Sequence, residues 1–345
     1  MAPRNNLFDT PLPDYVERDI VPSLIDHHES DEEDENAIQN HSALKQWVST
    51  EKTIIVWRNV FIFILLHLGA LYGFYLCFSA KIMTIICAFI LYIMGGLGIT
   101  AGSHRLWAHR SYKARFPLRI LLAIFQTMAF QNCVYEWSRD HRVHHKYSET
   151  HADPHNANRG FFFAHVGWLL CRKHPDVIRK GKDLKMDDLR ADPVVRFQEK
   201  FYLPLVGLIC FILPTILPYF LWSESLWNSY FICGLFRYVF TLHCTWLVNS
   251  VAHSWGMKPY DRRINPSENL FVSIGAIGEG FHNYHHTFPF DYSTSEYGFK
   301  YFNLTTGFIN VMAKIGWAYD LKKVSPEMIK QRRLRTGDLK MEHQW

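Results

Sequence analysis

The sequence predicts an all-α membrane protein in which four transmembrane helices form two hairpins and a helical, histidine-rich polar cap joins them. Three observations predict this class: four long apolar runs carry almost no charge, basic residues gather between the hairpins, and histidines come in tight groups. A bilayer core of about 30 Å requires about 20 apolar residues in a helix. Helices buried in a soluble core are the less favoured alternative, because four such runs rarely occur together in a soluble domain.

The elements follow in order from these runs. Residues 1–44 contain the acidic stretch HHESDEEDEN and are expected to form a disordered tail. An integral-membrane domain is expected over 45–335, followed by a C-terminal tail at 336–345. Its expected spans and intervening cytosolic segments are 54–77, 82–102, 103–201 (cytosolic), 202–222, 228–252 and 253–335 (cytosolic).

One run leaves the number of spans open. Ile120–Tyr135 is uncharged and could be a fifth span or an interfacial helix. It has 16 residues, and three amide side chains lie within it, so the interfacial alternative is favoured. In that arrangement every histidine group opens on the same side of the membrane.

The charge distribution orients the chain. Residues 101–200 hold 18 Lys and Arg against 10 Asp and Glu, whereas the turns within the hairpins contain only one base, Lys81. The positive-inside rule then places the N-terminus, the segment between the hairpins and the C-terminal segment in the cytosol. Nucleic acid is not an expected partner, because the basic residues lie between spans. Membrane lipid headgroups or a phosphate-bearing substrate suit them better.

Histidines gather in HRLWAH from His104, in DHRVHHKYSETHADPH over 140–155, and in HNYHH from His282. The i, i+3, i+4 spacing of HRVHH and HNYHH places three rings on one face of a helix. With Asn249 and His253 at the end of the fourth run, the groups provide nine histidines, more than one tetrahedral zinc ion uses. The cap is therefore expected to hold a dimetal site, whose metal could be iron, copper, nickel or zinc.

The pair His104 and His109 fits this picture least, because residues five apart on an ideal helix point in different directions. The segment is expected to bridge a helix end or to reach two different ions. Neighbouring arginines, at positions 105, 110, 139 and 142, are expected to keep the rings uncharged and ready to bind metal.

Several further residues could support the site or lie outside it. The acids that could accept the second N–H of a ligand ring are Glu136, Asp140, Glu149, Asp153 and Glu279. His151 and His155 follow turn signals and are expected to be loop residues. The isolated histidines, which are expected to have ordinary roles, are His67, His165, His174, His243 and His343.

The chain resembles the membrane-bound fatty acyl desaturases, and among them the stearoyl-CoA (delta-9) desaturases of animals. The likeness covers about residues 50–335 and rests on GITAGSHRLWAHRSYKAR, VYEWSRDHRVHHKYSETHADPHN, RGFFFAHVGWLLCRKHP, TWLVNSVAH and GEGFHNYHHTFPFDY. It implies an enzyme of the endoplasmic reticulum membrane, with both termini cytosolic. Such an enzyme uses two iron ions, O₂ and two electrons to insert a cis double bond between carbons 9 and 10 of palmitoyl-CoA or stearoyl-CoA.

The resemblance also implies an external electron source, cytochrome b5 and its NADH-dependent reductase. The sequence agrees, since it has no Gly-rich nucleotide loop after a strand and no haem-binding motif.

Site residues follow from the resemblance position by position. The implied metal ligands are His104, His109, His141, His144, His145, His253, His282, His285 and His286, with Asn249 binding through water. The implied contacts of the coenzyme A end are Asn59, Arg139, Asp140, Arg172 and Lys173. The residues implied to line the acyl tunnel near its bend are Gln131, Asn132, Trp137 and Trp246.

The closed end of the tunnel is expected at Tyr92 and Met94. Bulk at a closed end shortens what fits, so palmitoyl-CoA is predicted to be accepted as well as or better than stearoyl-CoA.

Two other functions stay open. A di-iron fatty acyl hydroxylase would use the same metal ligands and differ in the fate of the second hydrogen. A metal or proton transporter would require polar residues at midplane depth on several spans, and these are sparse here.

Overall fold

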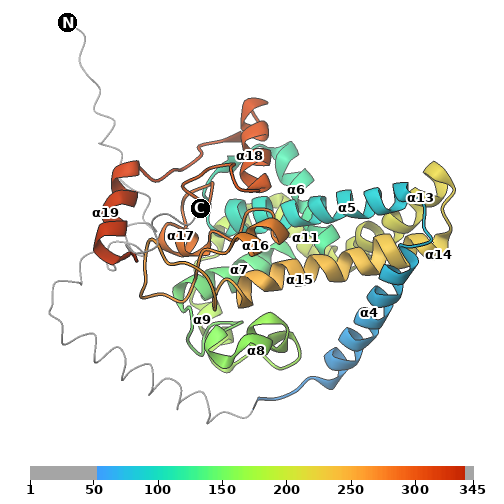
Figure 1. The fold of residues 1–345 in the computed structure, drawn as a ribbon, viewed down its shortest axis with the longest axis horizontal. Coiled ribbons are helices and arrows are strands. Elements are labelled where there is room, and N and C mark those ends of the chain that lie inside the picture. The colour runs from blue at the N-terminus through green and yellow to red at the C-terminus, as the bar shows by residue number, and fades with distance from the viewer. Residues whose placement is uncertain (1–52, 339–345) are drawn as a thin grey trace, which may run out of the picture. The chain divides into compact units, whose positions relative to one another are not determined.

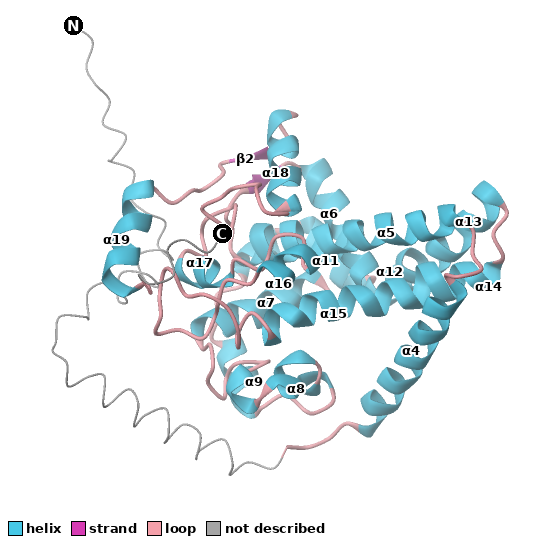
Figure 2. Ribbon diagram, viewed as in Figure 1, coloured by secondary structure: helices cyan, strands magenta, loops and turns pink. Residues whose placement is uncertain are grey.

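The structure of this chain is a computed structural model that describes residues 53–338. The expected acidic tail 1–44 and most of the expected C-terminal tail lie outside the described residues. Within them the regular secondary structure is almost all helix, joined by loops, and two short strands pair (Figures 1 and 2). Strand β1 (Lys113–Ala114) runs antiparallel to β2 (Ala318–Tyr319). The all-α class is confirmed.

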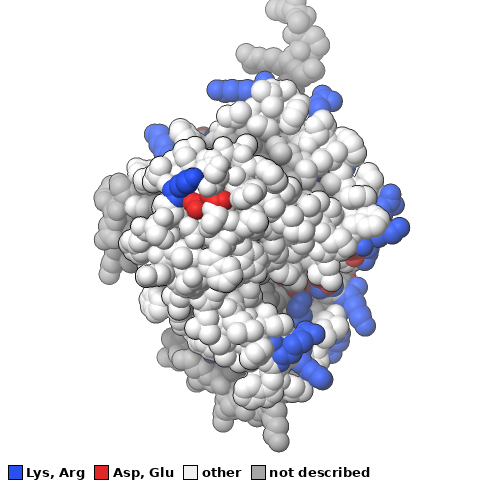
Figure 3. Space-filling model, turned by 90° about the vertical axis from the view of Figure 1, so that its right-hand side faces the viewer, with Lys and Arg blue, Asp and Glu red and all other residues white. Residues whose placement is uncertain are grey.

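Four helices in the described range are long and apolar enough to cross a bilayer: Trp57–Leu76, Ile82–Ala108, Tyr202–Trp222 and Leu226–Ser250. The labelled pieces that form them are α4 (Trp57–Leu76), α5 (Ile82–Leu97), η1 (Gly98–Ala108), α12 (Tyr202–Val206), η4 (Gly207–Ile212), α13 (Leu213–Trp222), α14 (Leu226–Ser229), η5 (Tyr230–Phe236) and α15 (Arg237–Ser250). Viewed onto the end where α13 and α14 lie, the surface carries few charged residues, and Lys and Arg gather at its edges (Figure 3).

The remaining helices are shorter. Those between the second and third spans are α6 (Phe116–Ala129), α7 (Val134–Lys146), η2 (Ala157–Arg159), α8 (Phe161–His165), η3 (Gly167–Leu169), α9 (Pro175–Lys182), α10 (Asp187–Ala191) and α11 (Pro193–Lys200). Those after the fourth span are α16 (Leu270–Gly275), α17 (His282–Thr287), α18 (Leu304–Lys314) and α19 (Pro326–Thr336). In Figure 1, α17 and α19 lie at the opposite end from α13 and α14, and α16 and α18 lie between.

Helix α6 occupies the place of the uncharged run whose role the sequence left open. It has 14 residues and ends where Phe130 adopts a left-handed conformation. A helix of that length extends about 21 Å, which is shorter than a bilayer core of about 30 Å. The interfacial interpretation of Ile120–Tyr135 is therefore the better one. At Gly98, α6 lies so close that an added Cβ would be 2.1 Å from the Gln126 nitrogen.

The segments η1, η4 and η5 are π-helical, a rarer and wider helix. Arg237 is buried beside two of them and donates to the carbonyls of Met128 (2.8 Å), Cys210 (2.8 Å) and Cys233 (2.9 Å). These carbonyls belong to α6, η4 and η5, so one guanidinium joins three elements. This accounts for the charge of Arg237 in the middle of the fourth span, since a charged group in hydrocarbon must face polar partners in the bundle interior.

Candidate metal centre

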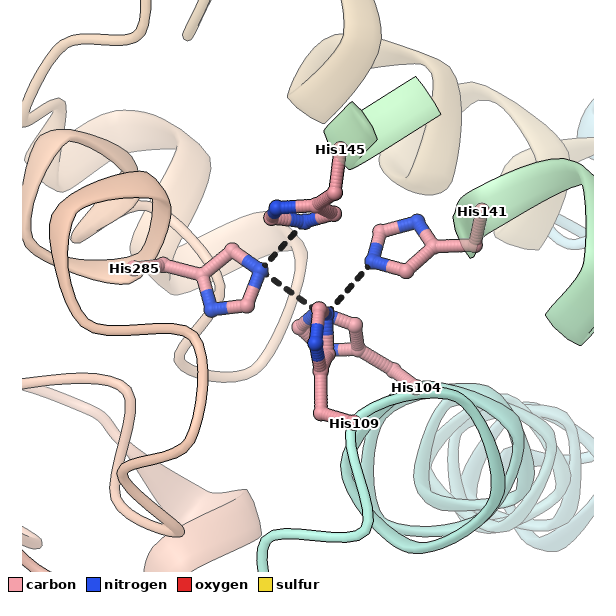
Figure 4. Close-up of side chains that lie close together, drawn as sticks. All are labelled: His104, His109, His141, His145 and His285. Carbon is pink, nitrogen blue, oxygen red and sulfur yellow. Dashed lines mark hydrogen bonds between the residues drawn. The ribbon is translucent and has the colours of Figure 1, made fainter. Parts of the chain in front are cut away.

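The nine expected histidine ligands form two groups, and in each group one ligand atom per residue lies within 4.8 Å of the others. The first group is His104, His109, His141, His145 and His285 (Figure 4). The second group is His144, His253, His282 and His286. Helix α7 contributes to both groups, as does α17, so the two groups adjoin.

The π-helical geometry of η1 brings His104 and His109 together. The backbone nitrogen of His109 donates to the carbonyl of His104 over 3.0 Å, a bond that joins residues five apart. Residues five apart then lie one turn apart, and their ring centroids are 4.9 Å from each other. The pair therefore contributes to one group rather than to two ions, and His109 lies where the helix ends.

Three carboxylates fix the protonation of three of the rings. Each lies within reach of one ring Nδ1 atom: Glu279 Oε2 at 3.1 Å from His104, Asp153 Oδ1 at 2.9 Å from His144, and Glu149 Oε1 at 2.7 Å from His253. A neutral imidazole carries one proton, and the carboxylate holds it on Nδ1. Each of these rings consequently turns an unprotonated Nε2 toward its group.

The ring nitrogens that face one another carry too few protons for every contact between them to be a hydrogen bond. His253 Nε2 lies 2.9 Å from His282 Nε2, which lies 3.1 Å from His286 Nε2. One N–H on His282 cannot serve both neighbours. The Nε2 of His144 is buried and has no hydrogen-bond partner. A cation among the rings would satisfy these lone pairs, so the donor set fits a metal ion in each group.

Burial lowers the pKa of six rings well below their ordinary value, and neighbouring rings lower it further: His109, His141, His145, His282, His285 and His286. Neutral rings are the form that binds metal. Burial is the main reason for the low pKa of His109, and the nearby Arg142 lowers it further, as expected, although each of the four arginines also pairs with a carboxylate. Arg105 lies 2.8 Å from Glu279, and Arg142 lies 2.5 Å from Asp188. Their charge is thus largely compensated.

Of the other expected supporting acids, Asp140 contacts no ring of either group and instead binds Arg139 and Lys173. Glu136 lies in the first turn of α7. His155 is in a loop, as expected, yet its ring centroid lies 4.3 Å from that of His144, and burial lowers its pKa to about 3. The turn residues around it gave no signal of that contact.

A cavity begins at the ring groups and continues between α5, α15 and α16. Its lining includes Trp137, Thr245 and Asn249 beside the rings and Tyr92 and Ile277 farther away. The Tyr92 hydroxyl donates to the carbonyl of Gly275, which also lines the cavity. A hydrogen bond thus joins α5 and α16 beside the cavity.

The other expected tunnel residues are not among those that line this cavity. Gln131 donates to the Thr245 hydroxyl over 2.9 Å, and the Asn132 carbonyl accepts from Gln126. Trp246 packs in a buried apolar cluster with residues of α4 and α12, and Met94 packs in another beside α6 and η5.

The residues expected at the coenzyme A end make two sets of contacts, one around the start of α4 and one around Asp140. Asn59 donates to the Leu169 carbonyl over 2.9 Å, and the Arg172 nitrogen donates to the Ile54 carbonyl. Lys173 and Arg139 both bind Asp140. Three bases and two polar groups thus gather near the N-terminal end of α4.

The sequence of this chain is similar to those of known proteins. The family model described as "Fatty acid desaturase" matches residues 79–306. The chain is 62% identical to "Acyl-CoA Delta-9 desaturase" of Acheta domesticus over 82% of this chain and 79% of that protein. It is 58% identical to "Stearoyl-CoA desaturase 5" of Homo sapiens over 82% of this chain and 86% of that protein. It is 57% identical to "Stearoyl-CoA desaturase" of Bos taurus over 95% of this chain and 88% of that protein.

Proposed function

Because this chain belongs to the fatty acid desaturase family, we propose that it is an acyl-CoA delta-9 desaturase, an oxidoreductase that inserts a cis double bond into a saturated acyl-CoA. The single observation that carries the proposal is the cavity that residues of both histidine groups line. The family membership and the relatives' names supply the reaction class.

The chemistry requires a metal, since an unactivated methylene has neither an acidic proton nor a leaving group for side chains to act upon. Iron bound by the nine histidines would supply the oxidising power that acts on the methylene together with O₂. The chain's own residues place the substrate. Near-attack placement within about 3–3.5 Å selects one methylene among many alike, and the cavity walls at Trp137 and Thr245 are positioned to provide it.

The acyl-CoA substrate would lie with its two ends in different surroundings. Arg139, Arg172 and Lys173 can pair with the phosphates of coenzyme A, although Arg139 and Lys173 bind Asp140 here. The acyl chain would pass the ring groups and end at Tyr92. The hydrogen bond of Tyr92 to Gly275 supports the expectation that palmitoyl-CoA fits at least as well as stearoyl-CoA.

The remaining parts of the proposal concern iron, electrons and location. We assign iron to both groups and cytochrome b5 with its NADH-dependent reductase as the electron source. We place the protein in the endoplasmic reticulum membrane with both termini in the cytosol. The four candidate spans and the excess of basic residues between the hairpins support this orientation.

The test is expression in a yeast strain that requires unsaturated fatty acids, followed by gas chromatography of the lipids. The chain should restore growth and produce monounsaturated acyl chains, and His144→Ala should do neither. Hydroxylated acyl chains would indicate the hydroxylase instead. Absence of any new lipid from cells that contain the folded, metal-loaded protein would refute the proposal.

A further inference from the structure

Three segments outside the four spans expose large apolar side chains. They are α16, the loop that precedes α18, and one face of α18 itself. On α18, the exposed Leu304, Val311 and Ile315 are seven and four residues apart, a spacing that places them on one side of the helix. We call the eight residues, each at least 40% exposed, the apolar shelf: Phe271, Ile274, Phe299, Tyr301, Phe302, Leu304, Val311 and Ile315.

The three segments of the apolar shelf adjoin one another. The Ser273 hydroxyl of α16 donates to the Tyr301 carbonyl over 3.4 Å, which joins α16 to the loop. A Cβ added at Gly307 of α18 would lie 3.2 Å from the Phe299 ring, so the loop also covers α18. The exposed side chains therefore belong to one surface. A contiguous apolar surface of this kind is typical of a site that binds a partner or a membrane.

The apolar shelf lies at the depth where the hydrocarbon core of a bilayer ends. The hydroxyls of Thr305 in α18 and Thr100 in the second span share a 2.8 Å hydrogen bond. Thr100 follows the start of its span at Ile82 by 18 residues, a helical rise of about 27 Å. Helix α16 packs against Val248, which lies about 33 Å along the fourth span from Leu226. The core is about 30 Å thick, so both helices meet the spans at the level of the headgroups.

Two lysines lie among these apolar side chains. Lys300 stands between Phe299 and Tyr301, and Lys314 precedes Ile315. Both lysines are exposed, and neither forms an ion pair within residues 53–338. Residues 299–315 contain no Asp or Glu. Aromatic side chains favour the membrane boundary, and lysines beside it attract anionic headgroups, so the composition of the apolar shelf suits an anionic lipid surface.

We propose that the apolar shelf docks into the headgroup layer of the membrane and that Lys300 and Lys314 bind anionic phospholipid there. The surface continues that of the spans, which favours lipid over a water-soluble partner. Apolar rings and the lysine stems would be buried at the acyl boundary, while the ammonium groups reach the phosphates. Helix α16 also contains Gly275, which lines the cavity, so docking would hold one cavity wall against the membrane. The proposal does not depend on the reaction that the cavity supports.

Fluorescence quenching tests the docking. The full-length protein is reconstituted into bilayers of phosphatidylcholine with a minority of phosphatidylserine, and a fluorescent amino acid replaces Phe271 or Phe302. Lipids that carry a nitroxide just below the headgroup quench only fluorophores close to them. Both positions should lose most of their fluorescence. Phe220, an exposed residue of the third span, is the positive control and should be quenched as strongly.

Leu334 is the matched negative control. It is 57% exposed, against 60% for Phe302, but it belongs to α19, at the opposite end of Figure 1 from α13 and α14. A fluorophore at this position should keep its fluorescence, and equal unfolding temperatures identify the variants that are folded. Quenching at Phe271 and Phe302 no stronger than at Leu334 would overturn the docking.

The same fluorophore at position 302 tests the charge. Nitroxide-labelled phosphatidylserine and phosphatidylcholine are compared at equal amounts, and the ratio of their quenching measures the local enrichment of anionic lipid. Lys300→Gln should lower this enrichment about fivefold at low salt, the usual contribution of one lysine near an anionic surface. Lys314→Gln should act alike on a fluorophore at position 311.

Two further variants separate charge from other effects of substitution. Lys300→Arg keeps the charge and should retain the enrichment. Lys330→Gln removes an exposed lysine of α19 and should leave the enrichment unchanged. Raised salt should weaken the enrichment in the wild type, since it screens exposed charges. Equal quenching by the two lipids in the wild type, or an enrichment that Lys300→Gln leaves intact, would overturn the assignment of anionic phospholipid.

Discussion

Glu279→Gln probes the two tasks that one carboxylate performs. Glu279 Oε1 binds the guanidinium of Arg105 over 2.8 and 3.0 Å, and Oε2 faces His104 Nδ1 at 3.1 Å. Arg105 is fully buried and Glu279 nearly so. Although burial opposes its charge, the adjacent Arg105 guanidinium and His104 hold the pKa of Glu279 below its usual range. The amide keeps the shape and removes the charge.

The expected losses follow from these contacts. Removing one partner of a buried ion pair costs about 3 to 5 kcal/mol of folding stability, because Arg105 keeps its charge in the interior. Arg105 retains the Tyr292 carbonyl and the Thr306 hydroxyl, which places the loss at the lower end. Losing the carboxylate on a ligand ring lowers metal affinity about 10- to 100-fold, equivalent to about 1.4 to 2.7 kcal/mol.

The assay pairs thermal unfolding with metal titration of the detergent-solubilised protein. Glu199→Gln serves as the control, because its partner Arg190 is exposed and such a pair contributes about 0 to 1 kcal/mol. Adding Arg105→Met to Glu279→Gln should recover part of the stability and none of the metal affinity. Wild-type stability together with wild-type metal affinity in Glu279→Gln would refute the role assigned to this carboxylate.

Three further predictions concern other parts of the molecule. Tyr92→Ala should lengthen the cavity at Tyr92, where the closed end of the tunnel is expected, and raise the preference for stearoyl-CoA over palmitoyl-CoA about tenfold in competition assays; an unchanged ratio would place the end elsewhere. Burial raises the pKa of Glu268 to about 8, so the folded state keeps a proton that the unfolded chain loses above about pH 4.3. The free energy of unfolding should therefore fall by about 1.4 kcal/mol per pH unit as the pH rises from about 4.3 to about 8. In denaturation measured across this range, Glu268→Gln should show a smaller dependence on pH. Arg237→Met should cost roughly 3 kcal/mol in unfolding measurements, because three buried carbonyls lose a donor; a stability equal to wild type would contradict that role.

The sequence predicts much of this fold because a bilayer requires long uncharged helices, and long uncharged runs are the strongest pattern in the sequence. Long uncharged runs gave the four candidate spans to within a few residues at most ends, and helical spacing gave the ring triplets of α7 and α17. The sequence predicted the end of the second span at 102, six residues before its end at Ala108, because the polar residues His104 and Arg105 were assigned to the cap. They continue the helix, since their polar groups find partners in the other histidines and Glu279.

What the sequence could not predict depends on contacts between distant segments. A π-helix has no local spacing rule that separates it from an α-helix, so the placement of His109 beside His104 was not foreseeable. Glu149 binds the ring of His253, which lies 104 residues away, and only the fold pairs them. The sequence gave no sign that the isolated histidines His67, His165 and His243 contact one another, because their rings meet only where the fold brings α4, α8 and α15 together.

The central claim is that nine ring nitrogens hold two metal ions in adjacent groups. The most direct test is elemental analysis of protein purified in a catalytically competent form, with His285→Ala and His253→Ala beside the wild type. The claim predicts two iron ions per chain in the wild type and about one in each variant, since the first substitution removes a ligand of one group and the second a ligand of the other. Competent protein that contains no transition metal, or only one ion per chain, would contradict it.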